Sequence, residues 1–189
     1  MAEIIGFAGS LSAPSRTKAL VELATQQSAR LSGMTAAVFD LSDLGTQFGA
    51  AQDLTKLDSR AHAVIDRIVA ADALVIGSPV YKGSYTGLFK HLFDLMEPDA
   101  LKGKPVLLTA TGGGYRHALV IEHQLRPLLG FFEAATVATG VYASSEDFTD
   151  GLPTSPALMT RLENAAVQLA SAIADRLHTR QRALAVSAA

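Results

Sequence analysis

Four hydroxyl-bearing residues and an arginine gather in one short stretch near the N-terminus: Ser10, Ser12, Ser15, Arg16 and Thr17. Residues 3–8, just before them, form an apolar run that predicts a buried parallel strand. After them, apolar residues recur with the period of a helix. The stretch is therefore a turn from a strand into a helix, where free N–H groups and the positive end of the helix dipole attract anions. Several hydroxyls and one arginine suit the three oxygens of a phosphate monoester.

The common glycine-rich phosphate motifs do not explain this turn. Gly9 is its only glycine, so the dinucleotide pattern G-x-G-x-x-G and the nucleotide pattern G-x-x-x-x-G-K-[ST] are both absent. The alternative is a turn without a ligand, in which Ser15 only caps the helix and the other serines close the loop. Four hydroxyls beside Arg16 favour the phosphate site over this alternative.

Two further loops have an unusual composition. Residues 79–85, Pro-Val-Tyr-Lys-Gly-Ser-Tyr, combine apolar and aromatic side chains with backbone donors freed by Gly83, which suits a flat heteroaromatic ring. Residues 111–116 contain three consecutive glycines, whose backbone N–H groups can approach the edge of a ligand. Taken alone, Tyr81 or Tyr85 could equally pack its own loop onto the domain, and the glycines could form a flexible turn.

Strand and helix patterns alternate along the chain, which predicts a parallel sheet covered by helices on both faces. Their spacing favours a flavodoxin-like, three-layer α/β sandwich with a five-stranded parallel sheet in the order 2-1-3-4-5. In such a sheet ligands bind beyond the carboxyl ends of the strands, where all three loops converge. The strands are expected at residues 3–8, 35–41, 73–78, 105–110 and 135–142, and the later helices at residues 59–71, 86–96, 117–132 and 155–178.

The composition fits one domain with a sizeable core: the chain has 189 residues, a net charge of −2 and 49 % hydrophobic residues. We expect residues 1–178 to form this domain, residues 179–189 to be a frayed tail and residues 42–57 to be a long polar loop. The absence of cysteine excludes disulfides and thiol catalysis. No apolar run is long enough for a membrane, near-neutral charge gives no general attraction to nucleic acid, and a cytoplasmic location is expected.

The sequence supports three other kinds of site less well than it supports a phosphate site. His117 and His123 share a predicted helix but not one of its faces, so their spacing does not favour a metal site. The nearest match to the serine-hydrolase motif G-x-S-x-G, residues 83–87, has tyrosine in the nucleophile position. Asp40 follows the second strand as a ribose-binding acid would, but without the glycine pattern it is expected to be a turn residue.

Residues 9–17, 78–90 and 109–113 together resemble the NAD(P)H-dependent FMN reductases, and they are most similar to the branch that supplies reduced FMN to alkanesulfonate and methanesulfonate monooxygenases. The resemblance covers residues 4–142, and its most specific part is the Pro-Val-Tyr-Lys loop. One departure is His123, where the alkanesulfonate relative carries a tyrosine.

The resemblance implies that FMN places its phosphate in the first loop and its isoalloxazine ring against the other two. It also implies NADPH or NADH as hydride donor, an FMNH2-dependent monooxygenase as partner, and a homodimer or homotetramer. The residues expected to bind the cofactor are Ser10, Ser15, Arg16, Thr17, Pro79, Val80, Tyr81, Lys82, Gly83, Thr111, Gly112, Gly113 and Gly114.

In such an enzyme the cofactors carry the hydride chemistry, so no catalytic acid or base is assigned. The backbone N–H groups of residues 112–114 are candidates for stabilising negative charge on the reduced flavin. Two alternatives stay open: a flavin-bound quinone or azo reductase, and a non-enzymatic electron carrier of the flavodoxin type. The net charge of −2 argues against a carrier, because carriers are usually strongly acidic.

Two of the expected helices predict features outside the site. Residues 86–96 and 117–132 carry more apolar residues than one packed face needs, which predicts that a second subunit covers them. Pro127 has no N–H and crowds the carbonyl of His123, so the second of these helices is expected to kink or to widen into a π-bulge near the interface. The alternative is a helix that begins late, with Pro127 in its first turn.

Overall fold

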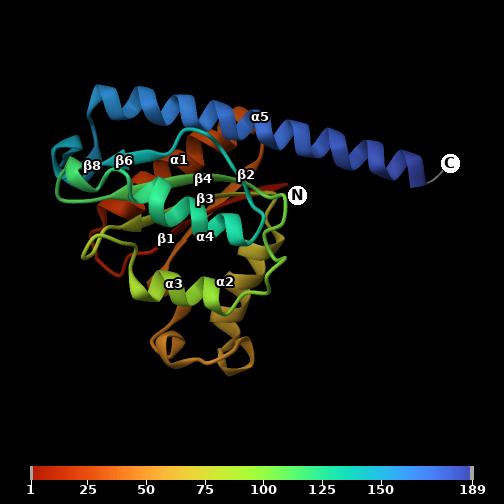
Figure 1. The fold of residues 1–189 in the computed structure, drawn as a ribbon, viewed down its shortest axis with the longest axis horizontal. Helices are drawn as coiled ribbons and strands as arrows, with labels where there is room; N and C mark the ends of the chain where they lie inside the picture. The colour runs from red at the N-terminus through yellow and green to blue at the C-terminus, as the bar shows by residue number, and fades with distance from the viewer. Residues whose placement is uncertain (1, 188–189) are drawn as a thin grey trace.

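A parallel sheet forms the middle layer of the protein, which is described by a computed structural model over residues 2–187. Helices cover both faces of this sheet (Figure 1). The observed order β2-β1-β3-β4-β5 is the predicted flavodoxin-like order, so the fold prediction is confirmed. The strands of this order are β1 (Glu3–Ala8), β2 (Thr35–Asp40), β3 (Ala73–Pro79), β4 (Pro105–Thr111) and β5 (Ala135–Thr136).

The helices fall into two layers. One face of the sheet carries α1 (Arg16–Ser32) and α5 (Pro156–Ser187), and the other carries α2 (Ser59–Ala70), α3 (Gly87–Asp94) and α4 (Arg126–Phe131). Side chains of every central strand enter the apolar clusters of both layers, which explains why these strands read as nearly continuous apolar runs. Within the part of the chain that the structure describes, no helix is both long enough and apolar enough to cross a membrane.

A glycine in β3 lets α1 lie close to the sheet. A Cβ atom added at Gly77 would lie 2.5 Å from a methyl carbon of Val21 in α1 and 2.4 Å from the hydroxyl oxygen of Thr109 in β4. Either neighbour would have to move to admit a side chain. The close packing sets the N-terminus of α1 directly beside the carboxyl ends of the central strands.

The sequence predicts one continuous fifth strand at residues 135–142, and this prediction is wrong. The strand is split into β5 and β6 (Val141–Ala143), and both segments pair with β4. Between them, side chains take over the hydrogen bonds of the backbone: Arg126 donates to the carbonyls of Val137 (2.9 Å) and Ala138 (3.2 Å). Gln168 of α5 accepts from the N–H of Thr139 at 2.9 Å. Because side chains from other elements satisfy these groups, they stay hydrogen-bonded where the strand is interrupted.

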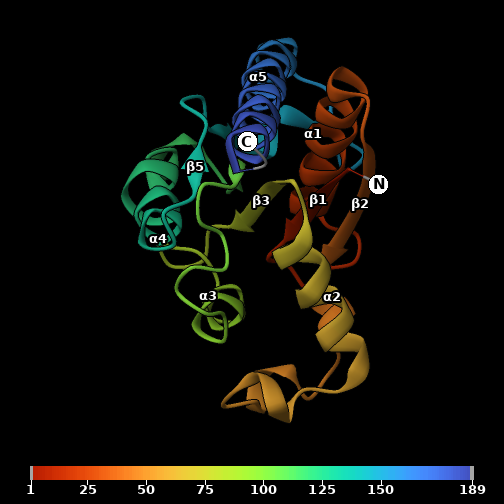
Figure 2. The same cartoon turned by 90° about the vertical axis from the view of Figure 1, so that its right-hand side faces the viewer.

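The β2–α2 segment, expected to be a polar loop, is folded. It contains three short 3₁₀ helices, Leu41–Leu44, Phe48–Ala50 and Leu54–Lys56. Leu44 and Phe48 are buried, and the Phe48 carbonyl lies 3.0 Å from Nε2 of His91 in α3. Figure 2 shows this segment projecting beyond α2, on the side away from α5. Its apolar residues therefore anchor it to the rest of the protein.

The last helix is longer than expected. Residues 179–187, expected to be a frayed tail, continue α5 as far as Ser187, and residues 188–189 lie outside the described residues. No glycine or proline follows Pro156, and alanine, leucine and arginine are frequent among the last residues of the helix. These residues favour helix strongly, so no local signal ends it.

The irregularity expected at Pro127 is confirmed. Residues Ile121–Leu125 form a π-helix, which runs directly into α4 at Arg126. The proline cannot donate the hydrogen bond that a regular helix would need here, and one wider turn accommodates the missing donor. A short 3₁₀ turn, Tyr115–His117, precedes the π-helix.

Candidate functional site

The three loops singled out in the sequence meet at the carboxyl ends of β1, β3 and β4. They enclose a cavity of about 220 Å³. Most of the residues expected to bind a cofactor line it. The lining residues are Ser10, Ser12, Pro14, Ser15, Arg16, Thr17, Pro79, Val80, Tyr81, Thr111, Gly112 and Gly113.

The first loop ends in the capped N-terminus of α1. The hydroxyl of Ser15 accepts a hydrogen bond from the N–H of Lys18 at 3.2 Å, which confirms Ser15 as the N-cap. The N–H groups of Arg16 and Thr17 have no partner within the helix, because no earlier turn exists to accept from them. Ser10 accepts from the N–H of Ser12 at 3.2 Å, which leaves its own hydroxyl hydrogen available to a ligand.

Thr17 has a different role from the serines of the first loop. Its side chain is buried, and its hydroxyl oxygen lies 2.6 Å from that of Thr111. This hydrogen bond ties the first turn of α1 to the end of β4. Thr17 and Thr111 therefore brace the wall of the cavity between the first and third loops.

Arg16 is exposed, and no carboxylate among the described residues is its partner. Its guanidinium carbon lies 5.8 Å from the ring centre of Phe148, a cation–π contact that holds it at the cavity. Within residues 2–187 the side chain makes no hydrogen bond or ion pair. An anion at the N-terminus of α1 would therefore meet an arginine whose hydrogen-bond donors are free.

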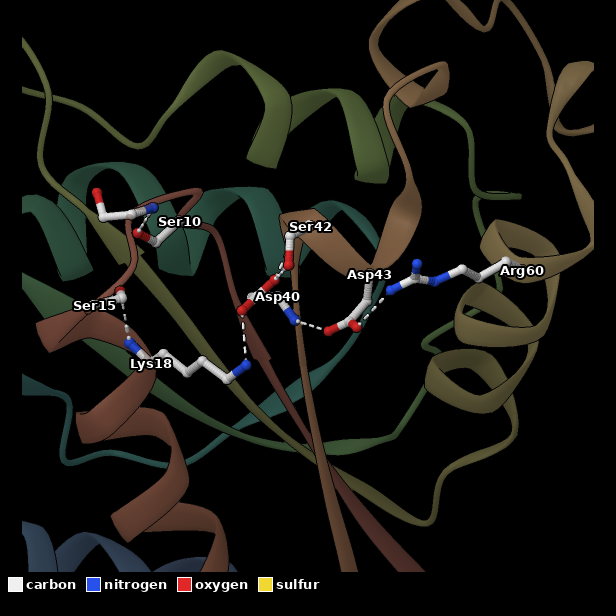
Figure 3. Close-up of polar contacts among 8 residues, drawn as sticks. Ser10, Ser15, Lys18, Asp40, Ser42, Asp43 and Arg60 are labelled. Carbon is white, nitrogen blue, oxygen red and sulfur yellow. Dashed lines mark hydrogen bonds and ion pairs between the residues drawn. The ribbon is translucent and has the colours of Figure 1, made fainter.

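Lys18, by contrast, is already neutralised (Figure 3). Its ammonium group donates to Asp40 at the end of β2, over 2.8 Å. Burial favours the neutral acid, but hydrogen bonds from Lys18 and Ser42 prevail and hold the pKa of Asp40 below its usual range. Asp40 also caps the first 3₁₀ turn of the β2–α2 segment, which agrees with its expected role as a turn residue. The ion pair removes the repulsion between a lysine and the positive end of the α1 dipole.

The second loop contains a tight turn from Tyr81 to Ser84. These two residues exchange backbone hydrogen bonds of 2.9 and 3.2 Å. Lys82 and Gly83 at its tip have positive φ angles of 53° and 86°. The conformation is the one that such two-residue turns require, and it is uncommon for a lysine. Val80 donates its N–H to the Thr111 carbonyl at 2.8 Å, so the second loop is fastened to the third.

The third loop is anchored by residues that sequence reasoning missed. The Tyr142 hydroxyl donates to the Gly114 carbonyl at 2.6 Å, and the Tyr115 hydroxyl donates to both oxygens of Asp147, at 3.0 and 2.9 Å. Burial raises the pKa of Tyr142, which keeps this hydroxyl protonated and able to donate. No local signal could link Tyr142 to a glycine 28 positions earlier.

These anchors correct one expectation about the glycine loop. The N–H of Gly112 donates to the Ala143 carbonyl at 3.0 Å, so it is not free to bind a ligand. A Cβ at Gly112 would lie 2.1 Å from the Tyr142 hydroxyl, so packing explains this glycine. A Cβ at Gly113 or Gly114 would meet nothing within 4 Å and would project into open space. The candidate backbone donors are therefore those of Gly113 and Gly114.

Three of the expected residues lie beside the first cavity. Lys82, Gly83 and Gly114 line a neighbouring cavity of about 700 Å³, together with Arg116 and His117. Val80 and Gly113 line both cavities, so the two adjoin.

Together the fold and the cavity define a class: a flavodoxin-like protein with two adjoining, loop-lined cavities at the carboxyl ends of its strands, beside the capped N-terminus of α1. Residues 2–149 match the family model of the NADPH-dependent FMN reductases. The chain belongs to this family.

Individual relatives agree with this assignment. The chain is 41 % identical over 174 residues to an FMN reductase (NADPH) of Pseudomonas aeruginosa, covering 92 % of this chain and 94 % of the relative. It is 45 % identical over 163 residues to the NADH-dependent FMN reductase SfnF of Pseudomonas putida, covering 85 % and 87 %. Among solved structures it is similar to an oxidoreductase from Corynebacterium diphtheriae, with a TM-score of 0.83 and 33 % identity over 93 % of this chain and 98 % of that one.

Proposed function

We propose that this protein transfers hydride from NADPH or NADH to FMN, whose phosphate binds at the N-terminus of α1. The observation that carries this proposal is the meeting of that capped helix end with Arg16, which has no carboxylate partner in the described chain. The residues fit a phosphate monoester. The N–H groups of Arg16 and Thr17 and the hydroxyls of Ser10 and Ser15 supply neutral donors, and the guanidinium supplies charge.

The second and third loops would hold the isoalloxazine ring. Pro79, Val80 and Tyr81 offer apolar and aromatic surface, and Gly113 and Gly114 offer backbone donors with no side chain in the way. When bound, FMN accepts a hydride from the reduced nicotinamide. The protein contributes position and electrostatic stabilisation, with no side chain required to transfer a proton.

Steady-state oxidation of NADPH and NADH by the purified protein, with and without added FMN, tests this proposal. The expected result is turnover that depends on FMN. A protein that binds FMN but oxidises neither nicotinamide would instead be an electron carrier. A protein that needs a quinone or azo dye as final acceptor, with FMN retained throughout, would favour the alternative reductase.

We further propose that the reduced FMN is passed to a monooxygenase that cleaves sulfonates, and that both proteins work in the cytoplasm. The resemblance of the Pro-Val-Tyr-Lys loop to reductases of sulfonate systems supports this role. Tyr81, one wall of the proposed ring site, is 58 % exposed, so this side of the site is open to solvent. In the test, the reductase should sustain desulfonation by a sulfonate monooxygenase when NADPH or NADH, FMN and oxygen are supplied.

We also propose that the protein forms a homodimer or homotetramer. The apolar surface that supports this is smaller than the sequence suggested. Phe89, Leu92 and Phe93 of α3 are buried in the core of one subunit, so α3 has no large spare apolar face. Leu119 and Phe131, at the two ends of the α4 region, are 63 % and 67 % exposed. A partner subunit would bury them. Light scattering at micromolar concentration should report at least a dimer, and Phe131→Asp should weaken it.

A further inference from the structure

The segment after β6 contacts two of the three loops of the site, although none of the residues predicted to bind the cofactor lies beyond Gly114. Asp147 accepts the hydrogen bonds of Tyr115, next to the glycine loop, at 3.0 and 2.9 Å. The ring centre of Phe148, the next residue, lies 5.8 Å from the guanidinium carbon of Arg16 in the first loop. Neither Asp147 nor Phe148 lines the cavity at the N-terminus of α1. Both therefore act on the site through other residues.

Phe148 is fixed in place. Its backbone belongs to β7 (Phe148–Thr149), which pairs antiparallel with β8 (Leu152–Pro153). The preceding residue is also fixed, because the carboxylate of the buried Asp147 accepts a hydrogen bond from the N–H of Ser144 at 2.7 Å. The ring of Phe148 is half-buried and packs against the apolar cluster that the central sheet forms with α1 and α5. A ring held in this way offers a stationary surface to a flexible neighbour.

Arg16 is a flexible neighbour of this kind. Its side chain is exposed and has several rotatable bonds. Within residues 2–187 it makes no hydrogen bond or ion pair, so its contact with the ring of Phe148 is what orders it. The separation of 5.8 Å is within the range at which an aromatic face attracts a guanidinium. The contact therefore favours conformations of Arg16 that keep its charge close to the N-terminus of α1.

An aromatic ring holds an arginine without neutralising it. Lys18, on the same helix, shows the alternative, because its ammonium group donates to Asp40 at 2.8 Å and its charge is compensated. The face of a phenyl ring carries no net charge and takes none of the conventional hydrogen bonds of a guanidinium. Arg16 thus keeps both its charge and its N–H donors for an incoming anion.

We propose that Phe148 is a positioning residue, which makes the site selective for the phosphorylated form of the flavin by holding Arg16 at the N-terminus of α1. The inference rests on the proposed function, since it assumes that the phosphate of FMN binds there. Because the side chain of Arg16 is ordered before FMN binds, less conformational entropy is lost on binding. Riboflavin has no phosphate to contact Arg16, so its affinity does not depend on Phe148.

Phe148→Leu tests the proposal, because leucine keeps an apolar side chain in the half-buried position and removes the aromatic face. The Kd for FMN, measured by quenching of flavin fluorescence, is expected to rise about threefold, and the Kd for riboflavin is expected to stay the same. Phe148→Tyr keeps the aromatic face and should retain both wild-type affinities. Phe39→Leu is a matched control, because it removes the cation–π contact of Arg67, which does not line the cavity, and it should leave both affinities unchanged.

A double variant separates positioning of Arg16 from a general effect on the fold. Without the guanidinium the ring has nothing to hold, so Arg16→Ala combined with Phe148→Leu should bind FMN as weakly as Arg16→Ala alone. Losses of affinity that multiply in the double variant would overturn the inference, since Phe148 would then act independently of Arg16.

Four other results would also overturn the inference: an unchanged FMN affinity in Phe148→Leu, a tighter one, equal losses for FMN and riboflavin, or a loss in Phe148→Tyr equal to that in Phe148→Leu. A tighter FMN affinity would show that the ring holds Arg16 away from the phosphate. Failure of the proposed phosphate site is distinguishable, because Arg16→Ala would then leave the FMN affinity unchanged. The inference alone fails if Arg16→Ala weakens FMN binding and Phe148→Leu does not.

Discussion

Replacing Arg16 with alanine should weaken FMN binding and leave riboflavin binding unchanged. A hydrogen bond to a charged group contributes about 1.5–3 kcal/mol. Arg16 is exposed, so water screens the contact and the lower end of this range applies. A loss of about 1.5 kcal/mol raises the Kd for FMN roughly tenfold. Riboflavin has the same ring without the phosphate, so it should bind weakly and with equal affinity to both proteins.

Quenching of flavin fluorescence on titration with protein measures both affinities. Arg30→Ala is a matched control, because it removes the same exposed charge from the last turn of the same helix, roughly 20 Å away along the axis. The difference between wild type and Arg16→Ala should also shrink with added salt. An FMN affinity unchanged in Arg16→Ala, or equal losses for FMN and riboflavin, would refute the assignment of the phosphate to the N-terminus of α1.

Other consequences of the structure can be measured separately. Tyr142→Phe removes the hydroxyl that donates to the Gly114 carbonyl and so loosens the third loop, on the ring side of the proposed site. The affinities for FMN and for riboflavin should therefore fall by the same factor, about threefold. A loss of affinity for FMN alone would contradict this. Lys104→Met should lower the free energy of unfolding, measured by urea denaturation, by about 2–3 kcal/mol. The reason is that the buried ammonium group donates to the carbonyls of Val69 and Ala71 at the end of α2. An unchanged free energy of unfolding would show that water replaces the ammonium group at these carbonyls. The stability that Asp40 contributes should be complete above about pH 4, the ordinary carboxyl value, and be lost as the pH falls through its lowered folded-state pKa. In Asp40→Asn this part of the loss of stability at low pH should be absent, which urea denaturation at a series of pH values measures. A loss of stability identical to that of the wild type would count against the Lys18 ion pair.

Local sequence signals were sufficient to predict the features of this protein that depend only on residues close together in the chain. The apolar run before residue 9, the serine at the N-cap and the helical period after it predict the strand, the turn and α1, because each is formed by short-range backbone geometry. Pro127 predicts a kink or a π-bulge for the same reason, since its ring acts on the carbonyl only four residues back, and the structure shows the π-helix. Alternation of strands and helices then brings the three loops to one edge of the sheet.

Only the tertiary structure decided which of those groups remain free for a ligand. Gly112 and Thr17 belong to the predicted site, yet their polar groups are engaged by Ala143 and Thr111 across the fold. The gap in the fifth strand depends on Arg126 and Gln168, which lie on other elements. A hydrogen bond between residues far apart in sequence forms only when packing brings them together, so periodicity and composition do not reveal it. For the same reason the sequence alone predicts a cation such as Arg116 but not whether a carboxylate faces it.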